Sequence, residues 1–508
     1  MLLAEVVATS RQVGATRSRS AKVAALAELI RGLERDEIRA AVAVVTGEPH
    51  QGKIGVGWAT VVALEVTPAP VASLTVGDLD AAVDELAAVG GAGSGALRQA
   101  VLQQLLGRAT ADEQEFVRRL LIGELRQGAL EGIVSDAVAK AAGVPLESVR
   151  RAAMLTGSLP ATAVLALTGG APALASVGLE VLRPLSPMLA ATAPDVATAL
   201  AGLGLSSVEW KLDGARVQAH RDGDEVRLFT RNLNDVTTRL PGVAAVVAAL
   251  AVERVVLDGE VIGIDDTERP DRFQDTMSRF GRHDGAGAGL QVAFFDCLHL
   301  DGVDLLDRPL AERVEALALA VGGLRVPSVM TDDPEEAGAF LAQSLAAGHE
   351  GVMVKGADSR YEAGRRGQAW RKVKPVRTFD LVVLAAEWGH GRRQGWLSNL
   401  HLGARHPDDP TRFVMVGKTF KGMTDQLLVW QTQRLQELET ARHGHVVVVR
   451  PELVVEVALD GVQGSSRYPG GVALRFARVR RYRSDKGPAE ADTIDDLRLL
   501  HGLGPMVD

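Results

Sequence analysis

The stretch VEWKLDGARVQAHRDGDEVRLFTR, residues 208–231, sets a lysine among alternating apolar and polar residues. Side chains alternate between the two faces of a strand, so Lys211 would share one face with Glu209 and Asp213. The Asp-Gly pair that begins at Asp222 separates two further alternating runs and predicts a β-hairpin. We therefore expect strands joined by tight turns here, with a lysine between two carboxylates.

Lys211 has an ordinary and a chemical interpretation. A lysine on an exposed strand face is usually solvated, and Lys-x-Asp-Gly arises by chance in about one chain in ten of this length. To act as a nucleophile, the amine must lose its proton, so its pKa must fall from near 10.4 to about 7. Carboxylates oppose that change, whereas partial burial and nearby cations or a divalent metal favour it. The chemical interpretation therefore predicts cationic groups elsewhere in the chain.

Length and composition limit the possible classes of protein. The chain has 508 residues, 46% of them hydrophobic, and a typical domain of roughly 150 residues predicts about three domains. No run of about 18 apolar residues and no basic leader occurs, so we expect neither a membrane span nor a targeting segment. Cys297 is the single cysteine, which excludes an intrachain disulfide and favours the cytoplasm. Because the net charge is −8, a nucleic-acid partner would need local basic clusters.

Three regions follow one another along the chain. Residues 1–180 carry helical periodicity and predict an all-α domain, with a glycine- and proline-rich boundary between about 168 and 188. Residues 181–375 mix alternating strands with helices and predict an α+β domain. Across 376–508, three strands, a helix capped by Thr424 and further strands predict an all-β barrel of the oligonucleotide-binding (OB) type. Other small barrels stay open as alternatives at this point.

Two later segments supply carboxylates that could serve Lys211. LDGE at 257–260 ends an apolar strand and places Asp258 and Glu260 on one face, where two acids suit a hard metal ion or a ribose hydroxyl. EGVMVK at 350–355 adds Glu350 next to another strand. Each segment alone is consistent with ordinary acidic turn residues, whereas together they predict one pocket.

Cations of the kind that Lys211 requires follow in AWRKVK at 369–374. Alternation along a strand would place Trp370, Lys372 and Lys374 on one face, as a cationic strip suited to phosphate. Taken alone, the segment is also consistent with an edge strand whose charges prevent aggregation. Together with the carboxylate segments, it completes the pocket that the lysine chemistry needs.

In this order, the segments resemble the motifs of covalent nucleotidyltransferases, and most closely the ATP-dependent DNA ligases shared by archaea, eukaryotes and some bacteria. The likeness covers residues from about 183 to 500 and extends more faintly to GELRQGALEGIVSDAV at 123–138, which resembles their helical DNA-binding domain. The matching motifs are KLDGAR at 211–216, FTRN at 229–232, LDGE at 257–260, FFDCLHLDG at 294–302, EGVMVK at 350–355, WRKVK at 370–374 and RFARVRRYRSDK at 475–486.

The resemblance implies three domains: a helical DNA-binding domain at 1–180, an adenylation domain at 181–375 and an OB-fold domain at 376–508. It also implies that Lys211 attacks ATP to form lysyl-AMP, with Mg²⁺ as the metal. AMP then passes to the 5′-phosphate of a nick in duplex DNA, and the adjacent 3′-hydroxyl displaces AMP to seal the strand. The demands on such a site are positioning and neutralisation of phosphate charge.

Roles in nucleotide recognition come with the resemblance. Glu209 would read the adenine edge, and Phe295 would stack on the base. Arg216 and Arg231 would contact the nucleotide and the 5′-phosphate of DNA. Each of these assignments is a carry-over from the family's motifs to the matching positions of this sequence.

Roles in metal and phosphate binding are implied in the same way. Glu260 would hold ribose or the metal, and Glu350 would help to bind magnesium. Lys372 and Lys374 would grip the α-phosphate, which makes them the cations that the Lys211 chemistry requires. Asp213 would assist the attack of the 3′-hydroxyl.

The C-terminal run at 465–486 has seven basic residues and one acid. A solvated edge strand would account for it, whereas the resemblance assigns Arg483, Asp485 and Lys486 to the motif that orients pyrophosphate. That role requires the C-terminal domain to move during the reaction cycle, with a hinge near 374–378.

Three rival functions share some of these features. An RNA ligase or an mRNA capping guanylyltransferase uses the same lysine chemistry, but the helical N-terminal third favours DNA. An NAD-dependent DNA ligase carries a four-cysteine zinc module that a chain with one cysteine lacks. A silent DNA-binding scaffold is disfavoured because no motif is visibly broken. We therefore expect a monomer acting on nicked duplex DNA in replication, repair or recombination, with any sliding clamp or repair partner left open.

Overall fold

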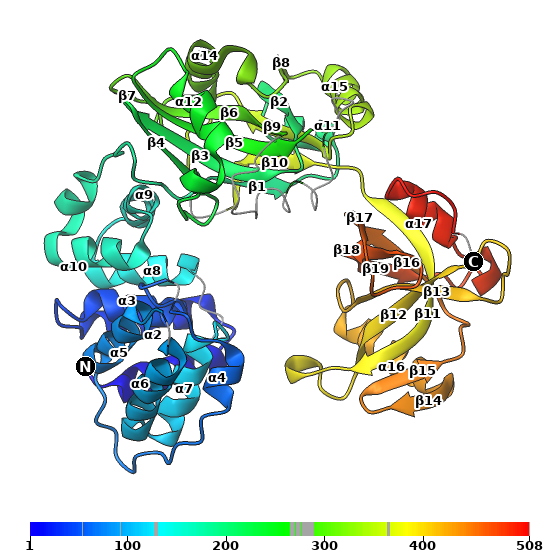
Figure 1. Cartoon of the computed structure of the whole chain (residues 1–508), viewed down its shortest axis with the longest axis horizontal. Helices are drawn as coiled ribbons and strands as arrows, with labels where there is room; N and C mark the ends of the chain where they lie inside the picture. The colour runs from blue at the N-terminus through cyan, green and yellow to red at the C-terminus, as the bar shows by residue number, and fades with distance from the viewer. Residues whose placement is uncertain are drawn as a thin grey trace. The chain divides into compact units, whose positions relative to one another are not determined.

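The computed structural model describes residues 1–52, 54–91, 93–125, 131–264, 270, 276, 289–362 and 366–506. The chain divides into two compact units, Met1–Val373 and Lys374–Asp508. Figure 1 shows helices in the first third of the chain, two sheets in the middle and a strand-rich C-terminal part. Of the stretch 123–138 that resembles a DNA-binding domain, residues 126–130 lie outside the described part of the chain.

The N-terminal part is all-α, as the sequence predicts. Thr75 and Thr110 begin helices by accepting hydrogen bonds from backbone amides three residues later, and each is the first residue of a capping box. Apolar faces of the helices meet in one core. The helices are α1 (Leu3–Ala15), α2 (Arg19–Arg31), α3 (Ile38–Thr46), α4 (Trp58–Val62), α5 (Val76–Ala88), α6 (Ser94–Arg108), α7 (Ala111–Leu121), α8 (Glu131–Ala142), α9 (Leu146–Thr156) and α10 (Leu159–Ala175).

Helix α10 differs from the sequence expectation at its end. The glycine-rich text after residue 168 suggested that helical structure fades there, yet α10 continues to Ala175. Gly170 takes φ 61° and ψ −153°, which kinks the helix, and Pro172 begins the continuation beyond the kink. The chain then runs without regular secondary structure from 177 to 188 before the first strand.

The middle of the chain is a mixed α+β region built on two five-stranded sheets. The hairpin that the Asp-Gly pair predicted is present, and its turn residue Gly223 has φ +59°. One sheet has the order β1-β10-β9-β2-β8 and the other β4-β3-β5-β6-β7. The elements are β1 (Leu189–Thr192), α11 (Val196–Ala201), β2 (Ser206–Lys211), β3 (Ala215–Asp222), β4 (Glu225–Thr230), α12 (Pro241–Ala248), β5 (Arg254–Gly263), β6 (Leu290–Leu300), β7 (Val303–Asp304), α14 (Leu310–Val321), β8 (Ser328–Thr331), α15 (Pro334–Ala346), β9 (Gly351–Gly356) and β10 (Arg366–Val373).

The C-terminal unit is dominated by β-structure, which confirms the fold class expected for it. Strands follow the order β13-β12-β11-β15-β14, and β16 joins β11 to β19. Among the described residues these strand pairs form an open sheet and do not close into a barrel. The order of strands and helix along the chain is nevertheless consistent with the OB type. The elements are β11 (Arg377–Trp388), β12 (Leu397–Arg405), β13 (Phe413–Thr419), α16 (Asp425–Glu437), β14 (Glu439–His443), β15 (Val446–Val449), β16 (Val454–Leu459), β17 (Gly461–Gly464), β18 (Val472–Arg475), β19 (Arg478–Tyr482) and α17 (Ile494–Leu500).

The composition gave expectations about membrane-spanning segments and about the single cysteine. No helix in the described ranges is both long enough and apolar enough to cross a lipid bilayer. Cys297 lies buried on β6, and burial raises the pKa of its thiol to about 12. The thiol therefore stays protonated at neutral pH and is a packing group of the core.

Glu387 on β11 gives the C-terminal unit a pH-dependent contribution to stability. Burial opposes its charge, but hydrogen bonds from Lys418, His401 and Asn399 lower its pKa from 4.5 to about 2. A depressed pKa stabilises the folded state above pH 4.5, and this stability is lost as the pH falls toward 2. We expect Glu387→Gln to cost roughly 3 kcal/mol near neutral pH and much less near pH 3.

Unfolding of the variant and the wild type, followed at several pH values between about 7 and 3, measures this difference. Glu437→Gln is the matched control, because Glu437 forms an exposed ion pair with Arg434 on α16. It should cost under about 1 kcal/mol at every pH. A Glu387→Gln cost that does not change with pH would contradict the linkage.

Candidate active site

Lys211 is the last residue of β2, and its side chain is 22% exposed. Its Nζ forms an ion pair with Glu350, which directly precedes β9. The backbone brings the two together, because the amide of Glu350 donates to the carbonyl of Lys211 at 3.1 Å. Lys211 is therefore a half-buried amine at a sheet end with a carboxylate next to it.

The strand register places the other groups of this sheet on the same face as Lys211. Directly paired residues in adjacent antiparallel strands project to one face, and alternate residues along a strand do the same. Glu209 pairs with Met353 of β9, which in turn pairs with Lys372 of β10. Lys372 is thus in the row next to that of Lys211, two strands away.

Glu209 is held within this face by protein groups. It is 3% exposed, its Oε2 lies 2.6 Å from Nζ of Lys355, and its Oε1 accepts a hydrogen bond from Ser207 at 2.9 Å. Burial raises the pKa of Glu209, and Lys355 opposes that rise. The amine of Lys355 also lies 4.4 Å from the ring centre of Phe295 and 4.3 Å from that of Trp370.

Phe295 occupies a bulge of the second sheet. Along β6, Asp296 pairs with Asp258 and Phe294 with Gly259, so Phe295 is the extra residue between the two pairs. Its carbonyl accepts a hydrogen bond from Lys355 at 3.1 Å. The bulge turns the Phe295 ring toward Lys355 of the first sheet.

Arg216 on β3 is engaged on several sides by the protein. Its guanidinium binds Asp258 in a bidentate pair, with Nε donating to Oδ1 at 2.9 Å, and Nη1 donates to the carbonyl of Met188 at 2.7 Å. Nη2 also lies 3.3 Å from the hydroxyl of Tyr361. The expected contact of Arg216 with a phosphate would therefore compete with these partners.

Glu260 on β5 has an unusual charge state. Burial raises its pKa to about 7, although Lys211 and Arg216 oppose the rise, while Asp258 and Asp213 add to it. These neighbours place Glu260 electrostatically beside Lys211. No group of three or more His, Cys, Asp or Glu residues that could hold a metal occurs in the described part of the chain, so Glu260 and Glu350 would need ligands from substrate or water.

The remaining predicted residues of this unit lie in turns. Asp213 follows β2 and is half-buried, and Arg231 follows β4 and is exposed. Gly214 lies between Asp213 and β3, where a Cβ would clash with the carbonyl oxygen of Val261 and approach Glu260 Cγ at 3.0 Å. The glycine of Lys-x-Asp-Gly is thus required by the close approach of β5.

Gly214→Ala is expected to destabilise the first unit by about 1–3 kcal/mol, because the backbone of β5 must move to admit the methyl group. Thermal melting measures the loss. Gly242→Ala in α12 is the matched control, since a Cβ there meets nothing within 4 Å. Equal melting temperatures for the two variants would show that β5 yields without cost.

Four predicted residues lie in the C-terminal unit. Strand β10 ends at Val373, and the amine of Lys374 donates to Asp460 at 2.9 Å. Arg483 and Lys486 both donate to Asp380 of β11 at 2.7 Å, and Arg483 also pairs with Asp485. The structure thus holds this motif in an ionic cluster within its own unit.

Sequence reasoning missed several groups that organise the site. Lys355 closes the EGVMVK segment, and a lysine after alternating apolar residues gave a signal that could have been followed. Tyr361 donates to Asp258 at 2.8 Å, and Arg313 pairs with Asp296 in full burial. No local pattern marks either residue, because the partners lie on other elements, 103 and 17 positions away.

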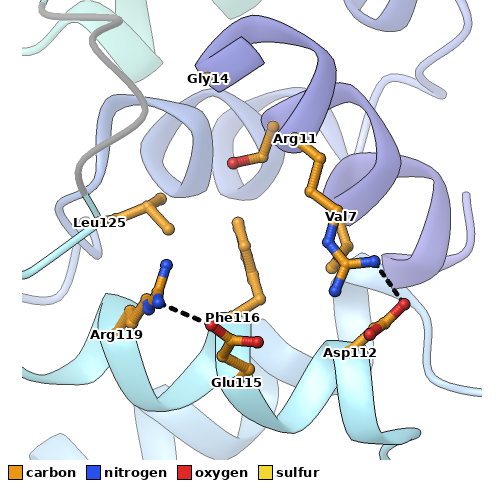
Figure 2. A pocket seen from close by; sticks show the side chains of 9 residues that line it. Val7, Arg11, Gly14, Asp112, Glu115, Phe116, Arg119 and Leu125 are labelled. Atoms are coloured by element: carbon orange, nitrogen blue, oxygen red, sulfur yellow. Dashed lines mark hydrogen bonds and ion pairs between the residues drawn. The ribbon is translucent and has the colours of Figure 1, made fainter. Parts of the chain in front are cut away.

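The helical part contains a pocket of its own between α1 and α7 (Figure 2), with a volume of about 150 Å³. Arg11 is paired with Asp112, and Arg119 with Glu115 at 2.6 Å. Phe116 and other apolar side chains line the space between these pairs. Because each cation faces an acid, the pocket has little net charge with which to attract a phosphate-bearing ligand.

Family models match most of the chain in three consecutive segments. Residues 62–139 match "DNA ligase N terminus", 187–374 match "ATP dependent DNA ligase domain" and 393–486 match "ATP dependent DNA ligase C terminal region". The motifs recognised in the sequence lie within the last two segments, apart from the faint match at 123–138.

Relatives and solved structures agree with these matches. A "Probable DNA ligase" of Rhodococcus opacus is 56% identical over 98% of this chain and 99% of the relative. Another "Probable DNA ligase", of Saccharopolyspora erythraea, is 56% identical over 99% of this chain and 98% of the relative. The solved structure named "Pmar-Lig_PreS3" covers 94% of this chain and 99% of its own at 20% identity, with a TM-score of 0.62, which is a likeness of fold.

Proposed function

Because this chain belongs to the ATP-dependent DNA ligase family, we propose that it seals 5′-phosphate/3′-hydroxyl nicks in duplex DNA through lysyl-AMP and DNA-adenylate intermediates. The observation that carries the proposal is the placement of Lys211. Its amine is half-buried, paired with Glu350 and electrostatically next to Glu260.

The first step would join Lys211 to AMP. The Nζ–P bond forms at the α-phosphate of ATP, the bond from that phosphorus to pyrophosphate breaks, and the amine loses its proton. Lys372 would neutralise phosphate charge from the neighbouring row of the sheet. Glu350, which pairs with Lys211, would hold the amine toward the nucleotide before attack and accept its proton.

Two further steps would complete sealing. The 5′-phosphate of the nick attacks the lysyl-AMP phosphorus and releases Lys211, and the 3′-hydroxyl then displaces AMP. Asp213 would assist the 3′-hydroxyl, and Arg231, which is exposed, would contact the 5′-phosphate. Lys374, Arg483 and Lys486 would act when the C-terminal unit presents them to the triphosphate, exchanging their internal acidic partners for phosphate oxygens. Asp485 would keep the guanidinium of Arg483 in position.

Recognition of the base would involve the face that carries Glu209. Glu209 would accept a hydrogen bond from the adenine amino group, and Phe295 would stack on the ring. Arg216 would support this pocket mainly through Asp258, since most of its donors are engaged by the protein.

The carboxylates of Glu260 and Glu350 fit a hard divalent cation such as Mg²⁺ by their oxygen chemistry. When bound, the ion would supply neutralisation of phosphate charge. Burial raises the pKa of Glu260 to about 7, so a nearby cation would favour its charged form. We further propose that the protein is a cytoplasmic monomer, which would take nicked DNA mainly by backbone contacts.

Sealing of a singly nicked duplex, with ATP and NAD compared side by side, tests the proposal directly. We expect sealing with ATP and Mg²⁺ and none with NAD. Labelling with ATP and GTP separates the rival capping activity, which would transfer GMP to the lysine. A protein that binds the nicked duplex but takes up no label would be the silent scaffold.

A further inference from the structure

Residues 182–188, which we call the strap, connect the helical part to the first strand and run along one face of β3. Gln218 and His220 of that face hold the backbone of the strap. Gln218 accepts from the amide of Leu185 at 2.9 Å and donates to its carbonyl at 3.2 Å. His220 accepts at Nδ1 from the amide of Leu182 at 3.0 Å. The strap thus crosses a face of β3 and is held there by side chains of that strand.

The end of the strap is fixed by groups of the candidate active site. The carbonyl of Met188 accepts from Arg216, and its amide donates to the hydroxyl of Tyr361 at 3.1 Å. The same hydroxyl donates to Asp258 at 2.8 Å. The backbone of Met188 is therefore held at both its N–H and its C=O, and each of the two partners also contacts the carboxylate of Asp258.

The other side of the strap contacts the helical part. The amide of Ser186 donates to the carbonyl of Met154 at the end of α9, at 2.9 Å. Met154 and Leu155 share an apolar cluster with Met188 and Tyr361. A cavity of about 400 Å³ lies between α9 and residues 360–362, and Met154 and Tyr361 are among the residues that line it. Both α9 and the site groups are anchored on the same short segment.

We propose that the strap couples the helical part to the nucleotide site, and that Tyr361 is the positioning residue through which the coupling acts. The inference rests on the proposed function, in which the helical part binds DNA and Lys211 carries AMP. If DNA binding shifts α9, the hydrogen bond from Ser186 to Met154 transmits the shift to the strap. The carbonyl of Met188 then moves Arg216, which donates to it. Arg216 lies directly opposite Glu260 in the register of β3 and β5. Adenylation and DNA binding then change each other's free energy by the same amount.

Tyr361→Phe tests the coupling by removing a single oxygen atom from the clasp. The probe is a nicked duplex with a 5′-hydroxyl, which cannot accept AMP. The dissociation constant is measured for the lysyl-AMP enzyme and for the AMP-free enzyme. In the wild type we expect the two constants to differ by about tenfold, and in Tyr361→Phe by about twofold or less. A loss of stability alone would change both constants and leave their ratio unchanged.

Tyr468→Phe in the C-terminal unit is the matched control and should keep the wild-type ratio. Gln218→Met, which frees Leu185 and leaves Met188 clasped, should lower the ratio in the same direction and replaces Tyr361→Phe if that variant fails to fold. A wild-type ratio near one, or a ratio unchanged in the variants, would overturn the coupling. Failure of the wild type to form lysyl-AMP would overturn the proposed function instead.

Discussion

Lys211→Ala is expected to abolish self-adenylation, with a loss of at least about 10³-fold in the labelled adduct formed from ATP without DNA. The reason is chemical: the variant has no amine where β2 meets Glu350, so no phosphoramidate bond can form. Lys355 also lies on this face, but its amine is bound to Glu209 and lies close to the rings of Phe295 and Trp370. It should not substitute as the nucleophile.

The self-adenylation assay has a control variant and a second substrate that does not require lysyl-AMP. Lys140→Ala removes an exposed lysine from α8 and should leave adduct formation within about twofold of the wild type. A nicked duplex that already carries AMP on its 5′-phosphate bypasses the first two steps, so Lys211→Ala should still seal it measurably. An acid-labile adduct that survives in Lys211→Ala would place the nucleophile elsewhere.

Arg313→Met is expected to cost the first unit about 3–5 kcal/mol of unfolding free energy. Arg313 on α14 and Asp296 on β6 are both fully buried, and Nε and Nη2 of the arginine bind the carboxylate at 2.7 and 3.0 Å. The guanidinium also donates to the carbonyls of Arg308 and Ser359. Methionine fills similar space but leaves the carboxylate of Asp296 buried and unpaired, which is the source of the cost.

Arg254→Met is the matched control, because Arg254 forms an ion pair of the same geometry that is exposed instead of buried. Arg254 binds Asp222 with the same pair of nitrogens, at 2.8 and 3.0 Å, but the two side chains are 51% and 38% exposed. Denaturant unfolding should give a much smaller loss of stability for this variant than for Arg313→Met, because water screens an exposed ion pair. If the buried carboxylate explains the larger cost, Arg313→Met with Asp296→Leu should be more stable than Arg313→Met alone. No recovery in the double variant would contradict that explanation.

The sequence predicted the site best where chemistry and local geometry coincide. Lys211 and Glu350 stand out because each is a charged residue at the border of an apolar alternating run, and the structure joins them. Glu260 was found in the same way and lies electrostatically beside Lys211. For Lys374 the prediction from alternation was less useful. Alternation along a strand predicts that Lys374 shares a face with Lys372, but the strand ends at Val373 and the amine of Lys374 binds Asp460.

By itself the sequence determined the all-α beginning, the α+β middle, the strand-rich end and the family, because periodicity and ordered motifs are local properties of the chain. The tertiary structure alone decided which groups that are distant in sequence share a hydrogen bond. Lys211 and Glu350 are 139 positions apart, and Tyr361 and Asp258 are 103. Such pairs depend on strand register and on packing between sheets. Neither the register nor the packing can be read from the periodicity of the residues involved.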